Sequence, residues 1–323
     1  MAGRMRKLVI FFALAAVLIG QAAAALPQQL LAVGMAVGIQ MQTDGVVITG
    51  FDPAGSAAER AGLKVGDVIC AVNGTPSSDA ATLRNQVSDC DGTLVVQAAR
   101  KGKQVEVLVH PARRADGYCL GVYIRDAIAG IGTVTYYDPE SGKFGALGHG
   151  ISDQATGQVL PLASGSLISA SVAAVVQGQA GAPGQLQGAF QPGRSIGTVT
   201  KNTAGGIFGN LYVRPVGQMV PVAPKEAVTT GEATILCNVN GNTVESYTVE
   251  ISRLYPTDAE GRNLLLKVTD ARLLAQTGGI VQGMSGSPIL QNGKLIGAVT
   301  HVLVNDPTRG YGILIENMLD AAA

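Results

Sequence analysis

The chain has 323 residues, a length that suggests two domains. Its 23 basic and 23 acidic residues balance and form no basic stripe, which argues against a nucleic-acid partner. Glycine is abundant, aromatic residues are scarce, and short strand-like runs outnumber helical ones. The composition therefore predicts a mainly β protein.

The N-terminus carries three basic residues, Arg4, Arg6 and Lys7, ahead of an apolar run from Leu8 to Gly20 and a zone of small residues. This order is typical of a secretory signal, so we predict a signal peptide over residues 1–26. The stretch from Leu8 to Leu26 is nearly long enough to span a bilayer, and a retained signal anchor is the alternative. In either case we expect the body of the protein outside the cytoplasm.

Four cysteines could form disulfides with three possible connectivities in an oxidising compartment. Cys70 lies within an apolar strand pattern, so we expect it to be a buried thiol. The sequence has neither a CxxC nor an HExxH motif and only three histidines. We therefore expect no metal site and no cofactor.

Residues 30–114 are expected to form a small α+β domain. An alternating strand over Val37–Met41 and a second strand over Gly45–Thr49 are separated by a predicted turn. A short helix is predicted after Ser56, which forms a capping box with Glu59, and a second helix over Asp79–Val87. Further strands follow on either side of glycine-containing turns.

The run from Ser56 to Gly74, SAAERAGLKVGDVICAVNG, resembles the core signature of bacterial PDZ domains attached to secreted proteases. The resemblance implies a groove that binds an extended peptide, often a C-terminus, as an added strand. We expect this groove between Met35–Met41 and the second helix, with its carboxylate-binding loop at Ala32–Met35. The residues expected to line it are Val37, Gly38, Ile39, Leu83 and Val87. A packing module with an empty groove is the alternative.

From Gly117 to the C-terminus, many short strands alternate with Gly, Asn or Asp-Pro turns. This spacing predicts a sandwich or a double β-barrel, with no long helix except over Ile315–Ala321. Within it lies Gly283-Met284-Ser285-Gly286-Ser287-Pro288, followed by a hairpin turn. A chymotrypsin-like protease presents its nucleophile in this way, with the amides of Gly283 and Ser285 as an oxyanion hole. A plain Gly/Ser-rich turn is the alternative.

His149 stands among small residues at a predicted strand end, a setting that suits a general base, although a structural loop histidine is also possible. Asp270 shares one strand face with apolar residues, which is costly unless the carboxylate has a partner such as His149. Asp153, Asp258 and Asp306 are alternatives. The order His149, Asp270, Ser285 is that of chymotrypsin-like enzymes.

The signal segment, the PDZ module, the string Gly148–Asp153 (GHGISD), an aspartate shortly before the serine, and Gly283–Pro288 together resemble the stage IV sporulation protein B family of serine peptidases. The resemblance implies a chymotrypsin-like double β-barrel over residues 117–323, with His149, Asp270 and Ser285 as the catalytic triad. It also implies secretion into the space between the forespore and mother-cell membranes. There the protease would cleave itself and the regulator of an intramembrane protease, which activates a late mother-cell sigma factor.

The strand after the nucleophile hairpin, Ile296–Val302, is expected to line the primary specificity pocket. We place Thr300 and His301 there, with His301 donating a hydrogen bond to a P1 glutamine or glutamate; a surface or structural role is the alternative for this histidine. For the whole chain, the competing hypothesis is a PDZ-bearing binding or scaffold protein with a degenerate protease fold. An HtrA-like protease is a weaker alternative, because it would place the protease before the PDZ domain.

Overall fold

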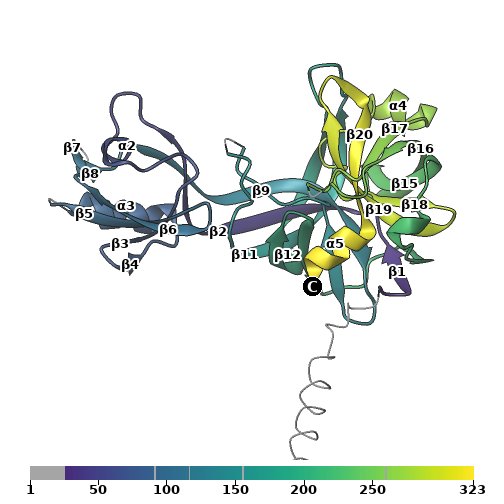
Figure 1. Ribbon diagram of the computed structural model, residues 1–323, viewed down its shortest axis with the longest axis horizontal. Helices are drawn as coiled ribbons and strands as arrows, with labels where there is room; N and C mark the ends of the chain where they lie inside the picture. The colour runs from purple at the N-terminus through teal and green to yellow at the C-terminus, as the bar shows by residue number, and fades with distance from the viewer. Residues whose placement is uncertain (1–25, 91, 116, 155, 259) are drawn as a thin grey trace, which may run out of the picture.

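The computed structural model describes residues 26–323 except 91, 116, 155 and 259. The signal segment predicted for residues 1–26 therefore lies almost entirely outside the described residues. Figure 1 shows a small lobe and a large lobe joined by two long strands, β2 and β9. In the described part of the chain, no helix is both long and apolar enough to cross a membrane. The protein is mainly β, as the composition predicts.

The small lobe has its own hydrophobic core, which includes Leu83 and Val87 of its second helix. Both predicted helices are present. The hydroxyl of Ser56 accepts from the amide of Glu59, as the predicted N-cap of the first helix, and the carboxylate of Asp79 caps the second by accepting from the amide of Thr82. Besides the ends of β2 and β9, the elements of this lobe are α2 (Ala57–Ala61), β3 (Val68–Val72), β4 (Thr75–Pro76), α3 (Ala80–Ser88), β5 (Leu94–Arg100), β6 (Lys103–Val109), β7 (Ala112–Arg114) and β8 (Gly117–Cys119).

β2 (Ala36–Phe51) and β9 (Val122–Tyr137) form one antiparallel ribbon that runs through both lobes. Their pairing extends from Ala36 opposite Thr133 to Phe51 opposite Val122, interrupted by bulges. The sequence predicted two shorter strands in each of these segments, separated by a turn in the first. That prediction was wrong, because the chain passes the Thr43-Asp44 step within a strand and absorbs the irregularity as a bulge.

The large lobe contains two β-barrels. In the first, the pairing of β9 with β2 closes a ring of six strands in the order β9-β10-β13-β12-β11-β2. β1 and β14 extend this sheet beyond β9. The remaining strands of this half are β1 (Gln29–Ala32), β10 (Lys143–Ala146), β11 (Leu162–Val176), β12 (Gln185–Thr203), β13 (Gly206–Leu211) and β14 (Gln218–Pro221), and the 3-10 helix η1 (Lys225–Ala227) follows them.

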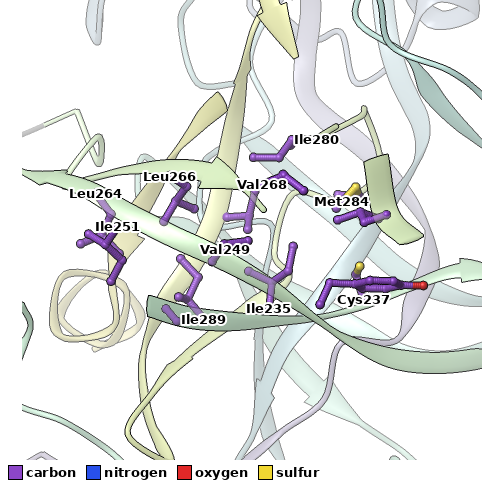
Figure 2. Close-up of a cluster of buried hydrophobic side chains, with 14 of the residues drawn as sticks. Ile235, Cys237, Val249, Ile251, Leu264, Leu266, Val268, Ile280, Met284 and Ile289 are labelled. Carbon is purple, nitrogen blue, oxygen red and sulfur yellow. The ribbon is translucent and has the colours of Figure 1, made fainter. Parts of the chain in front are cut away.

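The second barrel is closed in the order β15-β16-β17-β20-β19-β18. Its interior is filled by aliphatic side chains together with Cys237 and Met284, as Figure 2 shows. Burial raises the pKa of the Cys237 thiol, and all four cysteines are unpaired. The elements are β15 (Gly231–Asn240), β16 (Thr243–Leu254), β17 (Leu264–Val268), α4 (Ala271–Thr277), β18 (Pro288–Gln291), β19 (Lys294–Leu303), β20 (Asp306–Leu314) and α5 (Ile315–Ala322).

A further apolar cluster lies where the two barrels meet. Tyr136 and Phe208 come from the first barrel, Ala298 and Ile313 from the second, and Met318 of α5 packs among them. The predicted C-terminal helix is thus confirmed, and it helps to fix one barrel against the other. The double β-barrel that the sequence predicted is present, and its interface holds the site described next.

Candidate active site

Ser285 lies in the turn between α4 and β18, in the second barrel, and this turn faces the first barrel. The amide of Thr133 in β9 donates to the carbonyl of Ser285 (3.0 Å), and the hydroxyl of Thr133 donates to the carbonyl of Gly283 (2.8 Å). Gly286 adopts φ +97°, and a β-carbon there would collide with the carbonyl oxygen of Thr133. Only glycine allows this close approach between the nucleophile turn and β9.

The backbone amides of this turn alternate between bonded and unbonded. Those of Gln282, Met284 and Gly286 each donate to a backbone carbonyl. Among the hydrogen bonds of the described residues, the amides of Gly283 and Ser285 donate to no acceptor. Two free amides on either side of one residue are what an oxyanion hole requires, and these are the two that the sequence indicated.

His149 follows β10 in the first barrel. The two residues before it, Leu147 and Gly148, both have positive φ (69° and 70°), so the chain turns sharply to place the ring. Its Nδ1 lies 2.9 Å from the carbonyl oxygen of Gly150. Because a carbonyl can only accept, Nδ1 carries the proton and Nε2 keeps the lone pair that a general base needs. Burial lowers the pKa of His149, which keeps the ring neutral at physiological pH.

A single residue of β9 connects the loops of His149 and Ser285. The carbonyl of Thr133 accepts from the amide of Leu147 (3.2 Å), while the amide of Thr133 reaches Ser285. In this resting arrangement the hydroxyl of Ser285 donates to the carbonyl of Thr300 (2.7 Å). A rotation about χ1 of Ser285 is therefore needed before the hydroxyl can donate to a base.

Thr300 and His301, which the sequence assigned to a specificity pocket, lie on β19 beside this site. The side chain of Thr300 is buried and faces Gly148 of the His149 loop. The ring of His301 lies against the ring of His149, with centroids 4.7 Å apart. Desolvation, together with His149 and Arg262 nearby, lowers the pKa of His301 to about 4. The role of His301 in P1 recognition stays a prediction.

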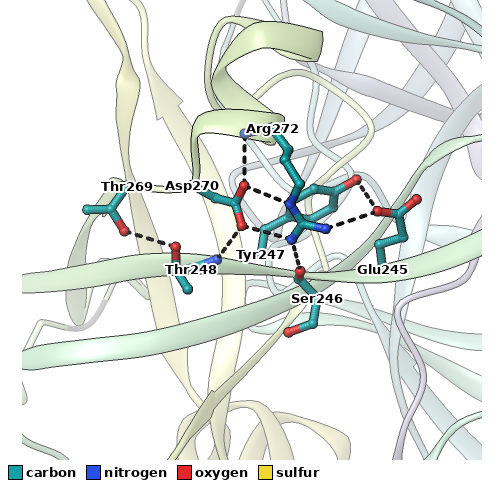
Figure 3. A network of polar contacts seen from close by, with 7 residues as sticks. All are labelled: Glu245, Ser246, Tyr247, Thr248, Thr269, Asp270 and Arg272. Atoms are coloured by element: carbon teal, nitrogen blue, oxygen red, sulfur yellow. Dashed lines mark hydrogen bonds and ion pairs between the residues drawn. The ribbon is translucent and has the colours of Figure 1, made fainter.

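Asp270 is not brought to His149. It caps the N-terminus of α4, where its carboxylate accepts from the amide and the guanidinium of Arg272 and from the amide of Thr248 (Figure 3). The side-chain hydrogen bond from Arg272 is the main cause that lowers the pKa of Asp270 to about 2. This buried carboxylate has a partner, as expected, but the partner is an arginine two residues away. The assignment of Asp270 as the group that orients His149 is therefore corrected.

The alternative carboxylates also have partners of their own. Asp153 accepts from the amide and hydroxyl of Thr156 and lies 3.7 Å from Arg125. Asp258 accepts from backbone amides of its own turn, and Asp306 accepts from Thr308. The orienting contact that the structure gives to Nδ1 of His149 is the Gly150 carbonyl, which no sequence motif marks.

The predicted peptide groove beside Val37, Gly38 and Ile39 is wrong. In this segment β2 pairs with β11 on one edge and with β9 on the other, so no edge is free for an added strand. The predicted carboxylate loop fails for the same reason: the amides of Val33 and Gly34 bond to carbonyls of β9. Leu83 and Val87 do lie at a groove, but the opposite wall comes from another part of the chain.

That groove is a pocket of about 290 Å³ between α3 and residues 118–124. Leu83, Arg84 and Val87 line one side, and Leu120 to Ile124 line the other. Gly121 has φ +72°, and the amides of Leu120 and Gly121 donate to no acceptor among the described residues. Two free amides at a left-handed turn suit a carboxylate. The sequence Tyr118-Cys119-Leu120-Gly121-Val122, apolar residues around one glycine, was the available signal.

Comparisons with known proteins match two parts of the chain to protein families. A family model described as SpoIVB peptidase S55 matches residues 116–319, and a PDZ domain model matches residues 33–110. Among curated proteins, no match to this sequence was found.

Two similar solved structures are the Rv3671c protease in an inactive form and a serine-to-alanine variant of Rv3671c from M. tuberculosis H37Rv, also inactive. They share 13% and 14% identity, with TM-scores of 0.36 and 0.32. Each match covers 59% of this chain, and 82% and 79% of the respective neighbour. The family match spans more than half of the sequence. The chain therefore belongs to the SpoIVB peptidase S55 family and is a serine peptidase that carries a PDZ domain.

Proposed function

We propose that Ser285 is the nucleophile and His149 the general base of this serine peptidase, and that Gly283 and Ser285 provide the oxyanion hole. The observation that carries the proposal is the pair of free amides at positions 283 and 285, in a turn that one strand residue ties to the His149 loop. A turn with only a structural role would not be expected to leave two such donors unpaired around one residue.

In the proposed reaction, Nε2 of His149 takes the proton of the Ser285 hydroxyl as Oγ attacks the substrate carbonyl carbon. The C=O electrons move to the oxygen, which the amides of Gly283 and Ser285 stabilise. His149 then gives its proton to the leaving amine as the C–N bond breaks. Water, activated by the same ring, hydrolyses the acyl-enzyme. The Gly150 carbonyl holds the tautomer throughout, the task that a carboxylate performs in other triads.

Labelling with a fluorophosphonate tests the nucleophile directly. We expect one adduct on Ser285 by peptide mass spectrometry, none in Ser285→Ala, and little in His149→Ala. Ser141→Ala, which removes an exposed turn serine, is the matched control and should label as the wild type does. An adduct on another serine, or none under conditions that label a control protease, would contradict the assignment.

We further propose that the protein acts outside the cytoplasm, in the space between the forespore and mother-cell membranes, on itself and on a membrane protein that regulates an intramembrane protease. The family membership and the N-terminal sequence pattern support this role. Cleavage of the regulator would free the intramembrane protease to activate a late mother-cell sigma factor. Co-expression with these partners tests the cascade: processing of the pro-sigma factor should require Ser285, and processing that continues in Ser285→Ala would refute it.

A further inference from the structure

Strand β9 has one edge that is unpaired for most of its length. From residue 122 to residue 133 it pairs with β2 on its inner edge. On its outer edge β10 covers residues 134–137, and Thr133 bonds to Ser285 and Leu147. For residues 122–131, the described part of the chain supplies no strand on the outer edge. An unpaired edge of this length is a template for an added strand.

The direction of individual backbone groups on this edge follows from Thr133. Its amide and carbonyl both point outward, and the register with β2 is unbroken from Thr133 to Ala127. Groups on alternate residues point to the same edge of a strand. The amides and carbonyls of Ala127, Ala129 and Ile131 therefore face outward. Those of the residues between them bond to β2.

This edge begins at one anion-binding feature and ends at another. At Val122 it meets the pocket beside α3, where the amides of Leu120 and Gly121 are free and Arg84 is close. At Thr133 it meets the turn of Ser285. In the half of this edge nearer to Thr133, Ala127, Ala129 and Gly130 are exposed and small, whereas the exposed Tyr123 lies in the half nearer to the pocket.

Two further hollows lie along the same stretch of β9. One, of about 520 Å³, is lined by Ala127 to Ala129 with Gln40 and Ser166; the next, of about 250 Å³, is lined by Ala129 and Gly130 with Phe190. They occupy a sheet face that β9 shares with β2 and β11. Side chains of a strand added at β9 would lie over this face at every second position.

We propose that the outer edge of β9 binds the C-terminal tail of the substrate as one continuous antiparallel strand. The tail's terminal carboxylate sits at the amides of Leu120 and Gly121, and its upstream residues run toward Thr133. An antiparallel strand that starts at this carboxylate site can run only toward the catalytic turn, because β9 itself leads there. The segment next to Thr133 then carries the bond that Ser285 attacks. This inference rests on the proposed function of Ser285.

In this arrangement the length of β9 sets the number of substrate residues between the terminal carboxylate and the scissile bond. About ten residues separate Gly121 from Ile131, and at about 3.3 Å per residue they span roughly 33 Å. Over residues 127–131 the register with β2 is unbroken, so extended substrate residues pair with β9 one to one, whereas the irregularity between Arg125 and Ala127 shifts the count by about one residue. The scissile bond is therefore expected about ten to twelve residues before the free C-terminus.

A peptide mixture derived from a cellular proteome, with free C-termini, tests this without knowledge of the preferred sequence. After digestion by the purified full-length protein, cleavage positions are counted from the C-terminus by mass spectrometry. We expect a peak at about ten to twelve residues. The peak should disappear when the same peptides are amidated at the C-terminus.

Ala129→Pro removes one outward amide without touching the ladder with β2, and Ala129→Ser keeps that amide. We expect Ala129→Pro to lower kcat/KM for tailed peptides about tenfold, and Ala129→Ser to leave it unchanged. Labelling of Ser285 by a fluorophosphonate should be equal in both. Cleavage positions that do not depend on the C-terminus would overturn the inference and leave the peptidase intact. Absence of any Ser285-dependent cleavage would overturn the proposed function, and this inference with it.

Discussion

The two ends of β9 each lie next to a turn with a pair of free backbone amides, but the surroundings of the two turns differ. At residues 120–121 and at residues 283–285, a glycine with positive φ accompanies two amides that have no acceptor among the described residues. The first pair lines a pocket with Arg84 and with the ion pair of Arg114 and Asp52, at a site where we place a carboxylate that exists before and after binding. The second lies beside His149 and His301, whose lowered pKa values keep both rings neutral.

This difference separates binding from catalysis. A permanent cation near a free amide pair favours an anion in the ground state, and so raises affinity. A neutral setting leaves the ground-state carbonyl almost unaffected and stabilises the charge only when it develops, which raises kcat. We therefore expect substitutions at residues 283–285 to alter kcat, and substitutions at residues 120–121 to alter KM.

The largest effect should come from the reacting groups. Ser285→Ala and His149→Ala should each lower kcat by about 10³-fold or more, because each removes a group that makes or breaks a bond. Binding of a fluorescent C-terminal peptide, measured by anisotropy, should stay unchanged in Ser285→Ala. A parallel loss of peptide affinity would show that the two ends of β9 are not separable.

Gly283→Ala should have the next largest effect. A β-carbon at φ +99° would lie 3.0 Å from the side chain of Leu186 and press on Ile131, which displaces the amides of the oxyanion hole. We expect kcat to fall about 10²-fold with little change in KM. Gly293→Ala is the matched control, since Gly293 also has positive φ but faces open space, and its activity should be that of the wild type.

Gly121→Ala should act only on binding. Its β-carbon would lie 2.8 Å from the carbonyl oxygen of Gly55 and so would shift the carboxylate turn. We expect KM for tailed peptides to rise about tenfold while kcat and fluorophosphonate labelling stay constant. Gly74→Ala, with the same sign of φ and no neighbour in reach, serves as the control. A fall in kcat would contradict the separation of the two ends.

Asp270→Asn should have the smallest effect on catalysis. Asparagine keeps the N-cap of α4 and loses the ion pair with Arg272, so we expect kcat to stay within about threefold and stability to fall by about 1 kcal/mol. Because its folded pKa is about 2, the wild-type carboxylate stabilises the fold above pH 3.8. That contribution to stability is lost as pH falls toward 2. Thermal melts of Asp270→Asn should therefore lack this pH dependence of stability. A loss of about 10³-fold in kcat would mean that Asp270 reaches His149 during turnover.

Local signals in the sequence predicted local structure correctly, and long-range pairings were not predicted. The helices α2 and α3, the Ser56 cap of α2 and the tight turn at Ser285 all depend on residues within a few positions of each other. The peptide groove depends on which strand lies beside α3, and that strand comes after the last predicted strand of the module. Alternation over Val37–Met41 predicts a strand correctly but says nothing of its neighbours. The pattern Asp270-Ala271-Arg272, an N-cap before a helical run that ends at two glycines, could have indicated the true role of Asp270.

The β2–β9 ribbon also has a consequence for how the protein is made. β2 ends at Phe51 and β9 begins at Val122, so residues 52–121, which form most of the small lobe, are an insertion in the tip of one long hairpin. The first barrel needs both strands and stays open until synthesis has passed the insertion. On a chain that emerges N-terminus first, the small lobe can fold once Val122 and Ile124 have emerged, before the strands that close the first barrel are available. The turn of Ser285 comes after the strands of the first barrel in the sequence, so its contact with Thr133 of β9 can form only after that barrel has been synthesised.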